Sequence, residues 1–146
     1  MIIPISLFVD TGFHVALASA KDRYHKEAFE YFKELNNQVE LITTDHIISE
    51  TYTHILYSKN GGYLVALKFL SNAMSAHDSN HMTIINTTSR DLRAAQVILE
   101  QYSDQTFSMC DAISFVVMER LSINSALAFD KHFYTMGKTV LPGPVE

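Results

Sequence analysis

Three aspartates stand at positions where a carboxylate could do chemistry. Asp10 and Asp130 each follow a short apolar run, Ile5–Val9 and Ala126–Phe129, that has the length of a buried strand. Asp111 comes three residues after a serine, which is the spacing of a capped helix start and puts the carboxylate in the first turn. Since ligands of open parallel α/β sheets bind beyond the carboxyl ends of the strands, carboxylates at that edge indicate a binding or catalytic site.

Two acidic residues have alternative interpretations. Asp10 could simply cap the helix expected over residues 12–20, because Asp is a favoured N-cap residue. Glu50 lies between Ile47 and Thr51 in a helix with a partly apolar pattern, where a charge is costly unless it is paired or bound to a ligand. From the residues alone, Glu50 either binds a ligand or points to solvent beside a basic residue.

Strands and helices that alternate along the chain must position these residues. We expect strands over residues 5–11, 39–43, 82–86, 126–129 and 139–141, and helices over 12–20, 24–36, 45–57, 63–76, 87–101 and 108–121. The last strand is expected at an edge, since the prolines at 142 and 144 cannot continue a ladder. The pattern predicts one α/β domain over residues 1–146, with no internal repeat.

The composition is that of an ordinary globular protein. The 146 residues are 47% hydrophobic and 18% charged. A single cysteine, Cys110, excludes an internal disulfide and favours a reducing compartment. We find neither a signal-peptide pattern nor an apolar run of about 20 residues, the length needed to span a bilayer, and therefore expect a cytoplasmic protein.

The charge balance leaves a nucleic-acid substrate possible. The formal net charge is −5, whereas nucleic-acid-binding domains usually carry a basic patch. Two divalent cations held by the carboxylates would change it to −5 + 4 = −1. Net charge therefore does not decide the question.

Carboxylates gathered at one edge would repel one another and raise each other's pKa, and a divalent cation relieves that repulsion. Oxygen ligands favour Mg²⁺ or Mn²⁺ over zinc. His77 and His81 are four residues apart, but in an expected loop they give only a weak zinc signal. Paired Mg²⁺ or Mn²⁺ ions stabilise the attacking and leaving oxygens of phosphodiester hydrolysis.

The chain resembles the PIN-domain ribonucleases, specifically the VapC-like toxins. The resemblance is carried by Asp10-Thr11, Ile48-Ser49-Glu50-Thr51, Ser108-Met109-Cys110-Asp111-Ala112 and Phe129-Asp130-Lys131-His132-Phe133. It implies a three-layer α/β/α fold around a central, mainly parallel sheet. It also implies that Asp10, Glu50, Asp111 and Asp130 bind metal and act in catalysis. Thr11 and Ser108 would orient ligands or water through their hydroxyl groups.

The activity that the resemblance implies is that of a Mg²⁺- or Mn²⁺-dependent endoribonuclease, the toxin of a type II toxin–antitoxin pair. Such a toxin would be a homodimer, silenced by an antitoxin whose C-terminal segment lies over the acidic pocket, and the helical hairpin over residues 45–76 would serve dimer and antitoxin contacts. We expect four basic residues to contact RNA phosphates: Arg90, Arg93, Lys131 and His132.

Other families and roles fit less well. Haloacid-dehalogenase phosphatases need a second Asp two residues after the first, where this chain has Gly12, and receiver domains need an acidic pair after the first strand. The sequence has no phosphate-binding glycine loop, dinucleotide fingerprint or Ser-His-Asp grouping. The remaining alternatives are an RNA-processing PIN nuclease without an antitoxin and a non-catalytic PIN-like binding module.

Overall fold

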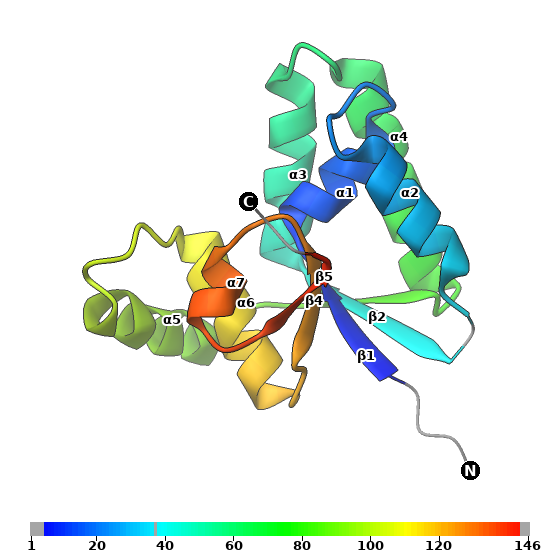
Figure 1. Cartoon of the computed structure of the whole chain (residues 1–146). Coiled ribbons are helices and arrows are strands. Elements are labelled where there is room, and N and C mark those ends of the chain that lie inside the picture. The colour runs from blue at the N-terminus through cyan, green and yellow to red at the C-terminus, as the bar shows by residue number, and fades with distance from the viewer. Residues whose placement is uncertain (1–4, 37, 144–146) are drawn as a thin grey trace.

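The structure is a computed structural model that describes residues 5–36 and 38–143. The strands are β1 (Ile5–Val9), β2 (Val39–Thr44), β3 (Met82–Ile85), β4 (Ser125–Ala128) and β5 (Thr139–Pro142). The helices are α1 (Thr11–Ala18), α2 (His25–Glu34), α3 (Asp45–Tyr57), α4 (Tyr63–Asp78), α5 (Ser89–Gln101), α6 (Met109–Arg120) and α7 (His132–Thr135). Helices cover both faces of the sheet, with α5, α6 and α7 on one side and α1 to α4 on the other (Figure 1).

The sheet is parallel and has β1 at its centre. The strand order is β3-β2-β1-β4-β5. Phe8 of β1 lies opposite Ile42 of β2 and opposite Ala126 of β4, in parallel register with both. After β1 the chain builds the sheet outward through β2 and β3, then returns to the other side of β1 for β4 and β5. The order reverses between β1 and β4, and such a switch point opens a crevice at the carboxyl ends of the two strands.

The central strands are apolar on both faces. Leu7 and Val9 pack with Leu127 and with Phe13 of α1, whereas Phe8 packs with the opposite cluster, which includes Phe115 of α6. A strand buried on both faces reads as a continuous apolar run and not as an alternating one. This explains why the sequence marks β1 and β4 so clearly.

The three-layer fold with a parallel central sheet is confirmed, and four differences from the predicted elements bear on the predicted residues. β4 ends at Ala128, so Asp130 lies two residues beyond the strand and not at its last position. The one-turn helix α7 was not predicted. It starts where the Asp130 carboxylate accepts the backbone N–H of His132 at 2.9 Å. Pro142 belongs to β5, whose edge position leaves its missing N–H without consequence. Residue 144 lies outside the described residues.

The fourth difference is that α4 continues to Asp78 and takes in His77. His77 Nδ1 accepts the backbone N–H of Ile84 at 3.2 Å, and His81 Nδ1 lies 3.1 Å from the hydroxyl oxygen of Ser79. Both rings are therefore engaged locally, and the weak zinc signal has no counterpart among the described residues.

α3 and α4 form the expected hairpin. The first helix is capped, because the Thr44 hydroxyl accepts the backbone N–H of Ile47 at 3.1 Å. Gly62 has a φ of 101°, a conformation that favours glycine, and makes the turn into α4. Tyr57 and Leu64 near the turn are 81% and 79% exposed, which leaves apolar surface for a protein contact. No described helix combines the length and apolarity needed to cross a membrane.

His14 of α1 is buried as a neutral ring. It packs edge-on against Phe69, and its Nε2 lies 3.4 Å from the Thr43 hydroxyl oxygen. That hydroxyl donates to the Val9 carbonyl at 2.9 Å, so its oxygen is left to accept from His14 Nε2–H. Burial lowers the pKa of His14 from 6.5 to about 4.

This shift predicts a specific acid sensitivity. Below pH 6.5 the unfolded chain takes up a proton that the folded chain rejects, so we expect His14 to lower the free energy of unfolding by about 2 kcal/mol at pH 5 relative to pH 7.5. Urea unfolding of the wild type and His14→Leu at both pH values measures the effect, since other titrating groups contribute to both proteins. If the difference between the two proteins is the same at both pH values, His14 does not titrate in this way.

Candidate active site

Four of the five carboxylates that line a pocket of about 510 Å³, at the carboxyl ends of β1 and β4, are the predicted ones. Asp10 follows β1, Asp130 follows β4, Glu50 comes from α3, and Asp111 comes from the first turn of α6. These elements are far apart in sequence, and the switch point between β1 and β4 brings them together. The four predicted acidic residues thus meet at one edge of the sheet.

Asp10 is the buried member of this acidic cluster and is only 6% exposed. Burial raises the pKa of Asp10 from 3.8 to about 8; the backbone N–H of Thr11 opposes the rise, and the charges of Asp111, Asp130 and Glu50 add to it. Asp10 occupies the N-cap position of α1, but within the described residues its carboxylate makes no capping hydrogen bond. The alternative role as a simple helix cap therefore has no support from the side chain, which is left available to a ligand.

Glu50 is held at the rim of the pocket by Thr11. The Thr11 hydroxyl donates to Glu50 Oε1 at 2.5 Å, which orients the carboxylate of an otherwise exposed side chain. The thiol of Cys110 lies near the acidic cluster. Burial raises the pKa of this thiol, and the charges of Glu50, Asp10 and Asp111 raise it further. A thiol so disfavoured as a thiolate is a poor nucleophile.

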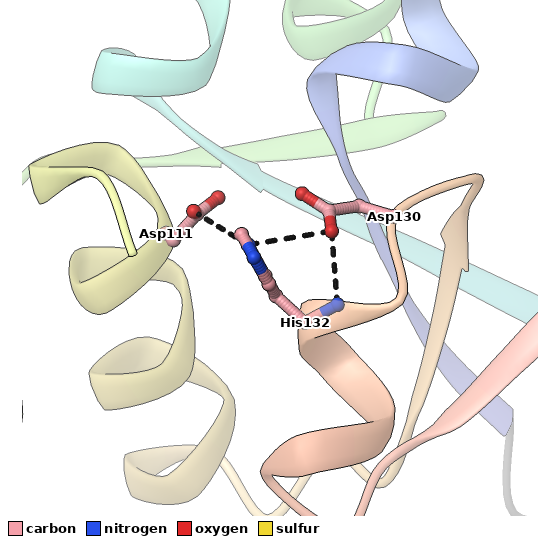
Figure 2. A group of neighbouring side chains, drawn as sticks. All are labelled: Asp111, Asp130 and His132. Atoms are coloured by element: carbon pink, nitrogen blue, oxygen red, sulfur yellow. Dashed lines mark hydrogen bonds and ion pairs between the residues drawn. The ribbon is translucent and has the colours of Figure 1, made fainter. Parts of the chain in front are cut away.

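Asp111 and Asp130 line the other side of the pocket, and the ring of His132 lies against both (Figure 2). Asp111 accepts the backbone N–H of Ser108 at 3.0 Å while the Ser108 hydroxyl accepts that of Asp111 at 3.0 Å, which is a complete capping box. His132 Nδ1 lies 3.2 Å from Asp111 Oδ2 and 3.3 Å from Asp130 Oδ1. The ring nitrogen thus lies between two carboxylates.

The residues present fit a divalent cation. A buried carboxylate whose neighbours carry like charge is unfavourable unless a positive charge compensates it. Asp111, Asp130 and His132 offer ligand atoms within 4.8 Å of one another, and the pocket adds Asp10 and Glu50. A set dominated by carboxylate oxygen suits Mg²⁺ or Mn²⁺.

Comparison with known proteins agrees with this geometry. The family model of the PIN domain matches residues 7–139. The chain belongs to the PIN-domain family. It is 29% identical over 131 residues to the 23S rRNA-specific endonuclease VapC20 of Mycobacterium tuberculosis, a match that covers 90% of this chain and 94% of that protein. It is 30% identical over 135 residues to a VapC ribonuclease of Archaeoglobus fulgidus, covering 88% and 80% of the two chains.

One of these relatives, VapC20, also has a solved structure of similar fold. The crystal structure of M. tuberculosis VapC20, described as a sarcin-ricin loop cleaving toxin, superposes with a TM-score of 0.81 at 26% identity and covers 91% of this chain and 96% of that one. The structure of FitAB bound to a DNA fragment gives a TM-score of 0.66 at 10% identity, covering 92% and 93%. The second likeness shows the fold alone.

The basic residues predicted to contact RNA take different positions in this PIN domain. Lys131 lines the acidic pocket and is exposed, and His132 contacts the carboxylates described above. Arg90 and Arg93 are exposed on α5 and lie outside the residues that line the pocket. A role in RNA binding for either arginine remains a prediction about a surface away from the carboxylates.

Four polar pocket residues were missed by the sequence analysis: Asp22, Arg23, Tyr24 and His54. Three of them lie in the loop between α1 and α2, which has no periodic pattern. Only the packing of that loop against Phe129 brings them to the pocket. His54 follows Glu50 by one helical turn, so the spacing of α3 could have revealed it.

Proposed function

We propose that this PIN domain is a divalent-metal-dependent endoribonuclease of the VapC type. The observation that carries the proposal is the buried carboxylate of Asp10 in one pocket with Glu50, Asp111 and Asp130. The names of both VapC relatives describe nucleases, and one of them acts on ribosomal RNA. This shared ancestry favours RNA as the substrate.

Asp10, Asp111 and Glu50 would hold the main ion, and Asp130 would complete the pocket or hold a second. Bound there, Mg²⁺ or Mn²⁺ would activate water and neutralise the charge that develops on the phosphate. In the hydrolysis, the water oxygen forms a bond to phosphorus while the bond from phosphorus to a ribose oxygen breaks, and that oxygen takes up a proton.

The chain's own residues fix the ligands before the substrate arrives. The Thr11 hydroxyl orients Glu50 through its 2.5 Å hydrogen bond, and the backbone of Ser108 orients Asp111 through the capping box. His132 lies between the carboxylates of Asp111 and Asp130, and its ring sets the distance between them. Such supporting contacts hold ligands at the geometry that the reaction needs.

The test is cleavage of total RNA by the purified protein with added Mg²⁺ or Mn²⁺. We expect metal-dependent cutting that EDTA abolishes and that Asp111→Asn lacks. Asp104→Asn is the matched control, because Asp104 lies exposed in the turn after α5, outside the acidic pocket, and its loss removes the same charge. If folded protein free of a bound inhibitor cuts neither RNA nor single-stranded DNA, the non-catalytic binding module becomes the better interpretation.

We further propose that the protein is the toxin of a type II pair and acts in the cytoplasm as a homodimer. A pocket lined by several carboxylates suits an antitoxin segment with basic residues. A neighbouring small gene for a DNA-binding protein that blocks the RNA cleavage would support the pair. An RNA-processing nuclease would have no such gene beside it.

A further inference from the structure

The loop between α1 and α2 builds a stack of flat side chains beside the acidic pocket. The ring of Tyr24 lies parallel to that of Phe129, with centroids 4.2 Å apart and planes at 4°. Phe129 in turn stacks on Phe13 at 5.9 Å. Arg23 completes the stack, with its guanidinium carbon 4.5 Å from the Tyr24 centroid. Because Phe129 covers one face of Tyr24, the guanidinium lies over the other.

The outer end of this stack is open to a ligand. Arg23 is exposed, whereas Tyr24 is half-buried and Phe13 is fully buried. Arg23, Tyr24 and Phe129 line the same pocket as the four carboxylates, and Phe129 directly precedes Asp130 in the chain. A group resting on Arg23 would therefore lie beside the acidic cluster.

Hydrogen bonds position the stack and its loop without a ligand. The Arg23 guanidinium donates to the Tyr24 hydroxyl at 2.6 Å, which ties it to the ring over which it lies. The Asp22 carboxylate accepts the backbone N–H of Tyr24 at 2.9 Å, and Asp22 N–H donates to the Ser19 carbonyl at 2.9 Å. His25 Nδ1 lies 2.7 Å from the Ala16 carbonyl oxygen and ties the loop to α1. Ordering costs little when the binding groups are already fixed.

We propose that Arg23, supported by Tyr24 and Phe129, is a stacking platform for an unpaired nucleobase of the RNA substrate, next to the phosphate that is cut. The proposal rests on the proposed nuclease function and extends it to the class of RNA recognised. Guanidinium planes and aromatic rings stack on splayed-out bases, which single strands and loops expose and a continuous duplex does not. Arg23 also adds positive charge to the acidic pocket, beside Lys131, and so favours the approach of a phosphodiester.

Binding measured in the cleavage-deficient Asp111→Asn protein tests the platform. The probes are a fluorescein-labelled single-stranded RNA, a hairpin with the same sequence in its loop, and the corresponding full duplex, each followed by anisotropy with Mg²⁺. We expect Arg23→Ala to weaken binding to the strand and the hairpin by about tenfold and binding to the duplex much less. Lys26→Ala, which removes an exposed charge from the first turn of α2, is the matched control and should change affinity less than twofold.

Two more measurements separate stacking from charge. Arg23→Lys keeps the charge but not the plane, and we expect it to bind nearly as weakly as Arg23→Ala. A 2-aminopurine moved along the single strand should show, at one position, a fluorescence change that Arg23→Ala abolishes. Wild-type affinity for Arg23→Ala or Arg23→Lys, or an equal loss on all three RNAs, would overturn the platform.

The two proposals fail in different ways. If the wild type cuts RNA and Arg23→Ala binds and cuts as the wild type does, the platform is wrong and the nuclease stands. If the wild type cuts no RNA but loses single-strand binding with Arg23→Ala, the nuclease is wrong and the platform stands.

Discussion

Asp10→Asn is expected to abolish RNA cleavage while making the metal-free protein more stable. The pKa of Asp10 is raised from 3.8 to about 8 in the folded protein, so between these pH values the folded state retains a proton that the unfolded state releases. The stability of the wild type therefore falls as pH rises through this range, with a total effect on the order of 5 kcal/mol at pH 8 and above. Asparagine is neutral at every pH in this range, so the stability of the variant does not fall in this way.

Urea unfolding in EDTA at pH 5 and pH 8.5 checks the stability, and the RNA assay checks the activity. We expect the advantage of Asp10→Asn over the wild type to be larger at pH 8.5, and cleavage to fall at least about 100-fold, since loss of even a residue that supports a ligand costs 10- to 100-fold. Added Mg²⁺ should raise the stability of the wild type and not that of the variant. A variant less stable than the wild type at pH 8.5 in EDTA would mean that a charged Asp10 is compensated by the protein itself.

Substitutions of Asp111 should separate its structural role from its chemical one. Asparagine keeps an oxygen that can accept the Ser108 N–H, whereas alanine does not, so only Asp111→Ala should lose the capping box and about 1 kcal/mol of stability. Both variants should lose cleavage at least about 100-fold, because neither carries the charge that the ion needs. Thermal unfolding and RNA cleavage of the two proteins, measured side by side, check these expectations.

The chain contains a matched control for this experiment. Asp91 occupies the same capping-box position at the start of α5, is 2% exposed and pairs with Arg120 at 3.2 Å, away from the acidic pocket. Asp91→Asn should therefore lose stability and keep cleavage, which is the opposite pattern to Asp111→Asn. If Asp111→Asn stays active, the assignment of Asp111 to the metal site is wrong.

The same pair of aspartates shows how far the sequence could predict the site. Thr88-Ser89-Arg90-Asp91 and Ser108-Met109-Cys110-Asp111 present the same capping spacing, and the structure forms both boxes. The local pattern therefore marks both helix starts, although the sequence analysis used it only for the second and began the first helix two residues early, at residue 87. It cannot tell which aspartate joins the pocket, because that depends on the order of strands in the sheet; only the resemblance to PIN domains selected Asp111.

The strands were predictable because the central ones are buried on both faces and leave unbroken apolar runs. Asp10 and Asp130 followed from those runs. Glu50 and Arg23 did not, for a physical reason: a charge on a helix or in a loop gives no local sign of whether it faces solvent or a pocket. The hydrogen bond from Thr11 to Glu50 and the contact of Arg23 with the Tyr24 ring form only in the folded chain.

The central position of β1 also has a consequence for the cell that makes this protein. β1 leaves the ribosome well before its neighbour β4, because β2, β3 and the helices α1 to α6 lie between them in the chain. A nascent chain can thus carry Asp10 and Glu50 without Asp130, and its acidic pocket stays incomplete until β4 has been synthesised. The proposed nuclease would therefore lack two of its four metal-binding carboxylates until α6 and β4 have been translated.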